Sequence, residues 1–179
     1  MDFIQSHFGQ VKEFSYKYIP DERGVFAKPF HARQFSVLSF DPVEFVEDFY
    51  SISKQGVLRG MHFQLPPQAH TKLVYCPIGE VLDVVVDLRK KSSTYGHAAV
   101  VELSAQNHRG LLIPEGFAHG FYTVSADAMV CYKVSTLHDP ALDAGIHWSS
   151  VADVWPDVLP LVSPRDENQP MLADFESPF

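Results

Sequence analysis

Short runs of β-branched and aromatic residues, separated by turn residues, recur along most of the chain. Residues of these types favour strands. The runs that fit a strand are Phe35–Phe40, Phe45–Tyr50, Gly56–Phe63, Lys72–Cys76, Val81–Leu88, Ala98–Leu103, Gly110–Ile113, His119–Val124 and Ala128–Ser135. Many short strands predict a mostly β fold, a jelly roll or a related closed sandwich whose sheets fold over one another.

The run Val81–Leu88 shows the period of two that a sandwich strand requires. One face carries Leu82, Val84, Val86 and Leu88, and the other carries Val81, Asp83, Val85 and Asp87. Because carboxylates are seldom buried, we expect Asp83 and Asp87 to face solvent or an interface.

Helical periodicity is scarce in this sequence. The best candidate is the carboxy-terminal part, where four prolines keep any helix short: Pro156, Pro160, Pro164 and Pro170. No repeat or linker interrupts the pattern. The 179 residues are therefore expected to form a single domain, 1–179, large enough to fold without disulfides or metals.

Composition and charge narrow the class of partner. Hydrophobic residues make up 46% and charged residues 20%, which is typical of a globular protein. The 14 Lys and Arg against 22 Asp and Glu give a net charge of −8, which would repel nucleic acid and anionic membranes. An anionic ligand would therefore have to be held by a few local cations.

The amino terminus and the cysteines both favour a cytoplasmic protein. The first ten residues, MDFIQSHFGQ, lack the basic region and apolar run of a secretory signal. Cys76 and Cys131 lie in apolar runs without metal-site spacing, so we expect reduced core thiols.

The segment from Gly56 to Gln64 places Arg59 and His62 in an otherwise apolar strand. Strict alternation would put these two side chains on opposite faces. Glycines within a strand mark a bulge or a close backbone approach, and Gly60 lies between the two residues. If both side chains line one cavity, a bulge near Gly60 must shift the register.

Three further polar residues stand out in apolar runs. Lys72 begins a strand, where it either caps the strand end in solvent or projects into a polar cavity. His119 lies next to Gly120, directly before an aromatic strand. Tyr132 lies between Val130 and Val134, and taken alone it reads as a packed core tyrosine with a bonded hydroxyl.

The stretch from Pro114 to His119 resembles the second sequence motif of the cupins. A metal-binding cupin would offer His-x-His and a downstream Glu, whereas this chain offers His62-Phe63-Gln64 and then Lys72. A neutral amide is a poor metal ligand and an ammonium repels a divalent cation. We therefore expect no metal site.

A closer resemblance rests on five segments that keep their order and spacing along the chain. They begin at Arg23 (RGVF), Gly56 (GVLRGMHFQ), Gly79 (GEVLDVVVDLR), Ile113 (IPEGFAHGF) and Gly145 (GIHW). Together they resemble the dTDP-4-dehydrorhamnose 3,5-epimerase family, roughly from Val11 to Leu172. The resemblance implies a cupin jelly roll with a few short, mainly carboxy-terminal helices.

The resemblance also implies a reaction. Members of the family invert the carbons that flank the C4 ketone of a nucleotide-linked 4-keto-6-deoxy sugar, without cofactor or metal, in deoxysugar or surface polysaccharide biosynthesis. By this resemblance His62 is the base, Asp166 the carboxylate that orients it, Lys72 the enolate stabiliser with His119 beside it, and Tyr132 the acid. Histidine suits its role because its ordinary pKa lies near about 6.5.

The resemblance implies cationic binding residues and, separately, a second subunit. Arg59 and Arg23 match positions that hold the diphosphate, and Arg165 falls where many relatives carry Lys. Without the resemblance, Arg23, Arg165 and Asp166 would read as solvated surface residues. The resemblance implies a homodimer in which exchanged amino-terminal strands bring Arg23 to the partner's pocket.

The departures from the family cluster on the nucleobase side. The chain has Glu47 and Phe49 where relatives commonly have Gln and Asn, Lys28 where they have Glu, and His138 where they have a base-stacking Tyr. One hypothesis is that the sugar is carried by another nucleotide, CDP or GDP, or is differently substituted. Two other functions stay open: a 3,4-ketoisomerase on the same scaffold, and a non-catalytic sugar-nucleotide binding protein.

Overall fold

The computed structural model describes residues 1–38, 43–156 and 159–179. The strands are β1 (Asp2–His7), β2 (Val11–Ser15), β3 (Lys17–Asp21), β4 (Gly24–Lys28), β5 (Glu47–Lys54), β6 (Leu58–Gln64), β7 (Lys72–Ile78), β8 (Glu80–Asp87), β9 (Ala98–Ser104), β10 (Arg109–Ile113), β11 (Phe117–Thr123), β12 (Asp127–Val134) and β13 (Asp143–Gly145). The helices are α1 (Ala32–Leu38), η1 (Trp148–Val154), α2 (Pro164–Glu167) and η2 (Leu172–Asp174).

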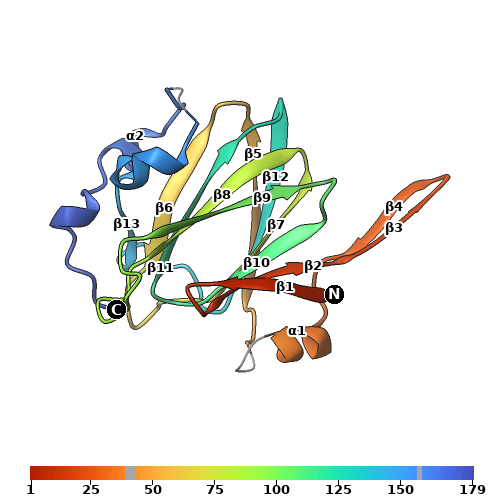
Figure 1. The fold of residues 1–179 in the computed structure, drawn as a ribbon, viewed down its shortest axis with the longest axis horizontal. Coiled ribbons are helices and arrows are strands. Elements are labelled where there is room, and N and C mark those ends of the chain that lie inside the picture. Colours follow the sequence, from red (N-terminus) through yellow and green to blue (C-terminus); the bar gives the residue numbers. More distant parts are fainter. Residues whose placement is uncertain (39–42, 157–158) are drawn as a thin grey trace.

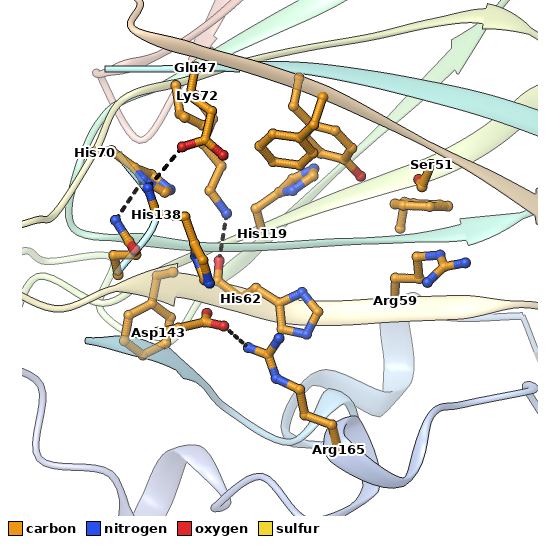
Figure 2. A pocket seen from close by; sticks show the side chains of 16 residues that line it. Glu47, Ser51, Arg59, His62, His70, Lys72, His119, His138, Asp143 and Arg165 are labelled. Atoms are coloured by element: carbon orange, nitrogen blue, oxygen red, sulfur yellow. Dashed lines mark hydrogen bonds and ion pairs between the residues drawn. The ribbon is translucent and has the colours of Figure 1, made fainter. Parts of the chain in front are cut away.

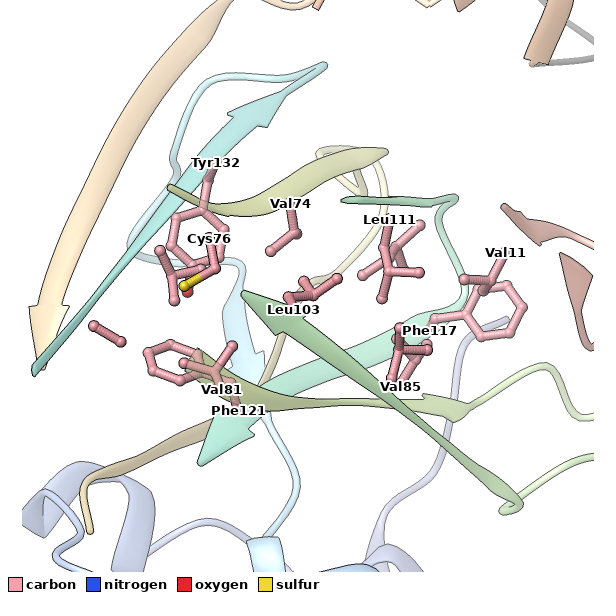
Figure 3. Close-up of a cluster of buried hydrophobic side chains, with 14 residues drawn as sticks. Val11, Val74, Cys76, Val81, Val85, Leu103, Leu111, Phe117, Phe121 and Tyr132 are labelled. Atoms are coloured by element: carbon pink, nitrogen blue, oxygen red, sulfur yellow. The ribbon is translucent and has the colours of Figure 1, made fainter. Parts of the chain in front are cut away.

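Two antiparallel sheets face each other and form a β-sandwich (Figure 1). Among the described residues, one sheet has the order β1-β2-β10-β7-β12-β5 and the other β13-β6-β11-β8-β9. Their inner faces enclose an apolar core to which Val74 and Leu111 contribute from one sheet and Val85 and Phe121 from the other (Figure 3). This arrangement confirms the mostly β, jelly-roll sandwich predicted from the sequence.

The outer faces of both sheets are covered as well. The carboxy-terminal segment, with η1, α2 and η2, packs on the five-stranded sheet, where Ile146 and Trp155 meet Val84 and Val86 of β8. Helix α1 covers part of the other sheet. The carboxy-terminal helices are short, as the prolines predicted, and Pro164 is the first residue of α2.

One predicted strand, Phe35–Phe40, is wrong. Residues 35–38 belong to α1, and residues 39 and 40 lie outside the described part of the chain. Phe35 is buried and contacts Phe14 of β2, with ring centroids 5.2 Å apart. Packing of one aromatic side chain onto the outer face of the sheet has overridden the strand propensity of the segment.

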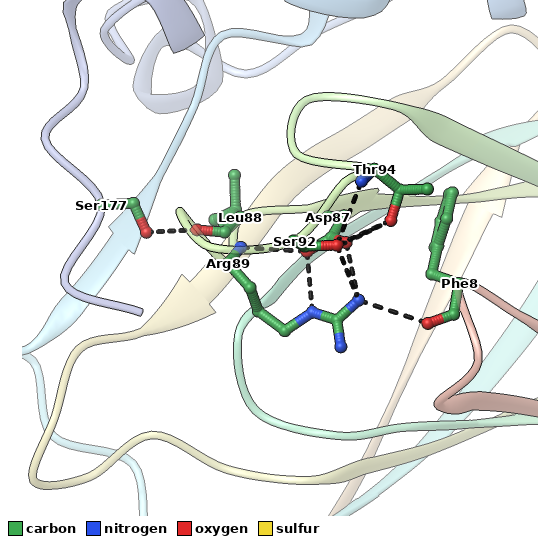
Figure 4. A network of polar contacts seen from close by, with 7 residues as sticks. All are labelled: Phe8, Asp87, Leu88, Arg89, Ser92, Thr94 and Ser177. Atoms are coloured by element: carbon green, nitrogen blue, oxygen red, sulfur yellow. Dashed lines mark hydrogen bonds and ion pairs between the residues drawn. The ribbon is translucent and has the colours of Figure 1, made fainter.

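The expectation for Asp83 and Asp87 is also wrong, because both side chains are fully buried. The alternation along β8 is correct, but the core covers one face of the strand and the carboxy-terminal segment covers the other. Asp87 is satisfied by Arg89, Ser92 and Thr94 in a compact polar network (Figure 4). Buried carboxylates need such partners, which the alternation pattern does not reveal.

The sequence pattern missed the strands β1 to β4 and β13. The hairpin formed by β3 and β4 projects from the sandwich (Figure 1), and almost all its side chains are exposed. Ile19, Val25 and Phe26 are exposed apolar residues on this hairpin. An isolated two-stranded hairpin is marginally stable in water, and this one buries little apolar surface within its own chain.

The bulge expected near Gly60 is confirmed. His119 of β11 pairs with His62 and Phe121 pairs with Arg59, so two residues of β6, Gly60 and Met61, lie opposite one residue of β11. The extra residue shifts the register of β6. Arg59 and His62 therefore line the same cavity.

The bulge depends on a close approach of two glycines. A Cβ on Gly60 would lie 2.6 Å from Cα of Gly120, and Gly60 has a φ of +134°. We expect Gly60→Ala to destabilise the fold by about 2–4 kcal/mol, because backbone strain and overpacking add. Gly24→Ala is the matched control: its φ is +124° and its Cβ would meet nothing within 4 Å. Urea unfolding measures both, and equal losses of stability would contradict this explanation.

Two smaller findings complete the fold. No helix in the described part of the chain is long and apolar enough to span a membrane. Cys76 is buried and Cys131 half-buried, and both are free thiols, as the sequence predicted.

Candidate active site

A cavity of about 380 Å³ opens between the two sheets (Figure 2). Nine of the predicted site residues line it: Glu47, Phe49, Arg59, His62, Lys72, His119, Tyr132, His138 and Arg165. Both sheets contribute, since His62 and His119 lie on the five-stranded sheet and Lys72 and Tyr132 on the six-stranded sheet. The folding of the two sheets over one another thus gathers residues that are far apart in sequence.

His62 is paired with the carboxylate of Asp166. Its Nε2 lies 2.6 Å from Oδ1 of Asp166, which is buried at the start of α2. The backbone amide of Asp166 donates to Oγ of Ser163, and the amide of Gly60 donates to Oδ2 of Asp166. The cap of a short helix and the β6 bulge together fix the carboxylate against the ring.

The negative charge of Asp166 suits a role in proton abstraction. Burial alone would raise the pKa of Asp166, but the hydrogen bond and charge of His62 and the Gly60 amide hold that pKa below its usual value. Asp166 is therefore an anion that accepts the Nε2 proton of His62. This fixes the tautomer in which Nδ1 is unprotonated and free to take a proton.

Lys72 lies in the wall of the cavity beside His62. Its side chain is buried, and its Nζ donates a 3.0 Å hydrogen bond to the backbone carbonyl of His62. Burial lowers the pKa of Lys72 to about 8, although the carboxylates of Asp143 and Asp83 partly oppose this. Of the two readings open from the sequence, the structure favours the polar cavity over the solvated strand end.

His119 forms a second pair with a carboxylate. Its Nε2 lies 2.8 Å from Oδ2 of Asp83, and both side chains are buried. Burial raises the pKa of Asp83, and the charge and hydrogen bond of His119 work against that shift. A carboxylate in this position stabilises positive charge on an imidazole, and a positively charged imidazole donates from both of its ring nitrogens.

Tyr132 lies on β12, across the cavity from β6. Its ring stacks on Phe49 of the edge strand β5, with centroids 4.8 Å apart, and meets His119 edge-on at 5.9 Å. Burial, followed by the charge of Asp83, raises the pKa of Tyr132 well above its usual value. The phenol therefore stays protonated at neutral pH and can serve as an acid.

The predicted cations are placed differently from one another. Arg59 is exposed at one end of the cavity, where its Nε donates to Oγ of Ser53 at 2.9 Å. Nη2 of Arg165 lies 2.8 Å from Oδ2 of Asp143. The structure does not bring Arg23 to the cavity: it is 85% exposed beside Asp21 on the projecting hairpin.

The residues that depart from the family pattern make contacts within the protein. Oε2 of Glu47 accepts the backbone amide of His138 at 2.9 Å. Phe49 stacks on Tyr132. Lys28 lies on the projecting hairpin, near the ring of Phe26.

Some cavity residues escaped the sequence analysis. Ser51, Gln64, His70 and Asp143 line the cavity, and Asp83 lies behind His119. The usable signal for Asp83 was its inward position between Val81 and Val85, two core residues of the same face. A carboxylate at an inward position needs a partner, and this requirement could have pointed to His119.

The donor set does not suit a metal. Within residues 1–38, 43–156 and 159–179, no three His, Cys, Asp or Glu side chains are grouped so as to hold a metal ion. The Lys72 ammonium lies among the candidate ligands His62 and His119. A cation held there would meet electrostatic repulsion.

Comparisons with known proteins agree with this geometry. The family model for dTDP-4-dehydrorhamnose 3,5-epimerase matches residues 5–174. The enzyme of that name from Shigella flexneri is 44% identical over 176 residues, covering 97% of each chain. A dTDP-4-dehydrorhamnose 3-epimerase from Streptomyces niveus is 39% identical over 156 residues, which are 86% of this chain and 75% of that one.

A solved structure shows the same fold. The 3,5-epimerase from Legionella pneumophila, in complex with dTDP-4-keto-L-rhamnose, superposes with a TM-score of 0.89 at 36% identity. The match covers 98% of this chain and 94% of that one. The chain is therefore a member of the dTDP-4-dehydrorhamnose 3,5-epimerase family.

Proposed function

We propose that this protein epimerises a dTDP-linked 4-keto-6-deoxy sugar at C3, at C5 or at both, in deoxysugar biosynthesis. The observation that carries the proposal is the placing of His62 and Tyr132 on facing sheets, with one cavity between them. A base on one wall and an acid on the other can remove a proton from one face of a sugar ring and return one to the opposite face.

The proposed steps follow from the geometry. Nδ1 of His62 takes the proton from the carbon next to the ketone, and the electron pair of that C–H bond moves to the carbonyl oxygen. Lys72 and His119 donate hydrogen bonds to the resulting enolate oxygen. Tyr132 then gives its phenolic proton to the opposite face of the carbon, the carbonyl re-forms, and the phenolate and the imidazolium exchange protons with solvent.

The two other functions explain fewer of the observations. A ketoisomerase moves the carbonyl from C4 to C3 and does not require an acid opposite the base. A binding protein does not require the His62–Asp166 pair at 2.6 Å, nor a buried Lys72 beside it. Epimerisation uses His62, Asp166, Lys72 and Tyr132.

A direct assay separates these functions. The protein is incubated with dTDP-4-keto-6-deoxyglucose, and the ring stereochemistry of the product is read from proton coupling constants. We expect inversion at C3, C5 or both. Movement of the ketone to C3 would support the ketoisomerase, and recovery of unchanged substrate would support the binding protein.

We propose dTDP as the nucleotide, in preference to CDP or GDP. The named substrates of the relatives support this choice. The residues that depart from the family pattern argue less strongly for another nucleotide than they did in the sequence, because some of them make contacts within the protein. Glu47 and Phe49 engage His138 and Tyr132 of the same chain. Calorimetry with dTDP, CDP and GDP tests the choice, and tighter binding of CDP or GDP would contradict it.

We also propose a homodimer in which the β3–β4 hairpin of one subunit reaches the cavity of the other. The exposed Ile19, Val25 and Phe26 supply an apolar surface on this hairpin, and Arg23 at its turn would add a cation for the diphosphate. Sedimentation equilibrium is expected to give a dimer that Phe26→Asp dissociates. A monomeric wild-type protein with full activity would contradict the proposal.

The lowered pKa of Lys72 predicts how the activity changes with pH. Because burial lowers its pKa to about 8, the free enzyme loses the ammonium as pH rises through that value. We expect kcat/KM to fall on this alkaline side. Lys72→Arg keeps its charge, so its alkaline limb should move to higher pH even if activity is lower. Profiles from about pH 6 to about pH 10 measure this, and identical limbs for both proteins would contradict the role of Lys72.

A cytoplasmic location is proposed as well. It is supported by the two free thiols of Cys76 and Cys131, which fit a reducing compartment. Fractionation of the producing cells would test it.

A further inference from the structure

His70 is a cavity residue to which the mechanism gives no task. It lies two residues before Lys72 and lines the main cavity. Its Nε2 is a buried atom without a hydrogen-bond partner in the described part of the chain. Buried ring nitrogens normally have partners, so this one calls for an explanation.

The orientation of Gln64 decides which nitrogen of His70 holds the proton. Oε1 of Gln64 accepts the backbone amide of Asp139 at 2.7 Å. Nε2 of Gln64 lies 2.8 Å from the carbonyl of Gln68 and 3.2 Å from that of Leu137. Carbonyl oxygens only accept hydrogen bonds, so the group between them is the amide NH2.

The same NH2 lies 3.2 Å from Nδ1 of His70. Because the NH2 group only donates, a protonated Nδ1 would face it donor to donor, so this contact favours the unprotonated Nδ1. The single proton of a neutral His70 is therefore on Nε2. Burial, with the charge of Lys72, lowers the pKa of His70 to about 3, so the ring stays neutral at physiological pH. The result is a neutral, tautomer-fixed N–H donor with no acceptor of its own.

The position of His70 indicates the part of the ligand that would supply the acceptor. Figure 2 shows His70 on the same side of the cavity as Lys72, whereas Arg59 lies at the opposite end. A diphosphate belongs with guanidinium groups. A neutral donor beside Lys72 suits an uncharged oxygen near the reacting carbons, which is a sugar hydroxyl or carbonyl.

We propose that His70 binds the substrate by donating its Nε2–H to an oxygen of the sugar, and so helps to select a sugar nucleotide over the free nucleotide. This inference rests on the proposed function, because it places the sugar beside Lys72. Gln64 acts as a positioning residue, since its amide holds His70 in the donating tautomer.

A competing explanation lies on the other side of the ring. His70 also borders a small cavity of about 10 Å³ near Pro114 and Phe117. A cavity of this size holds about one water, which could accept the Nε2–H instead. In that case ligand binding would leave the Nε2–H unaffected.

Binding measurements with two variants distinguish these explanations. The ligands are dTDP-glucose, which binds without reacting because it has no ketone, and dTDP. We expect His70→Phe to weaken dTDP-glucose about tenfold and dTDP hardly at all, because one hydrogen bond to the sugar is lost. His70→Gln, which keeps an N–H donor, should recover part of the loss. Equal weakening of both ligands, or of neither, would overturn the proposal.

Nitrogen NMR on histidine-labelled protein adds a readout that does not need activity. We expect His70 to show an unprotonated Nδ1 and a protonated Nε2, with the Nε2–H resonance moving when dTDP-glucose is added and staying when dTDP is added. A protonated Nδ1, or an Nε2–H resonance that does not move when dTDP-glucose is added, would overturn the inference. Both experiments read binding alone, so an absence of epimerase activity would be recognised separately.

Discussion

The His62→Ala variant is expected to lose proton exchange at every carbon of the substrate. We propose His62 as the base, because Asp166 lies 2.6 Å from its Nε2 and leaves Nδ1 to accept the proton. Removing a general base typically costs a factor of about 10²–10⁴, and we expect a loss of about a thousandfold. The measurement is deuterium incorporation from heavy water into the sugar at saturating substrate.

A second histidine of the cavity provides the matched control. His138 lines the same cavity, but only its backbone amide, which a substitution retains, is bonded to Glu47. His138→Ala should therefore keep exchange within about tenfold of the wild type. Near-normal exchange in His62→Ala, with the fold intact by circular dichroism, would show that another group is the base.

The Tyr132→Phe variant is expected to separate exchange from inversion. His62 can still remove a proton and return one to the same face, so deuterium should enter the recovered starting sugar. Inversion needs an acid on the opposite wall, and we expect it to fall by about 10²–10⁴. Proton NMR in heavy water distinguishes label in the starting sugar from label in the epimer.

Tyr75→Phe is the corresponding control, because Tyr75 is a half-buried tyrosine on the neighbouring strand β7 and does not line the cavity. It should leave both processes near the wild-type rate. If Tyr132→Phe instead loses exchange and inversion to the same extent, the phenol takes part in deprotonation. If it loses neither, another group delivers the proton.

Much of the fold could be predicted from the chain because its strands are short and strongly patterned. Eight of the nine predicted strands overlap strands of the structure, and the bulge at Gly60 follows from the need to place Arg59 and His62 in one cavity. The failures have physical causes. Phe35 joins a helix because it packs on the sheet, and Asp83 is buried because its partner, His119, lies on another strand.

The candidate site was predictable in its residue types and less so in its contacts. The family resemblance implied site roles for His62, Lys72 and Tyr132, and all three line one cavity. No local pattern could show that Gln64 fixes the tautomer of His70, because the residues that orient Gln64 come from a distant loop. Arg23 does not line the cavity of its own chain, and an oligomeric state cannot be read from a single sequence.

The central claim is that two residues of one cavity act on opposite faces of the sugar. His62 removes a proton beside the C4 ketone on one face, and Tyr132 returns a proton on the other. The most direct test of this claim is to incubate the wild-type protein with dTDP-4-keto-6-deoxyglucose in heavy water and to locate deuterium by NMR. The account predicts label at C3, C5 or both, in a product inverted at the labelled carbon. Label at neither carbon under saturating substrate would contradict it.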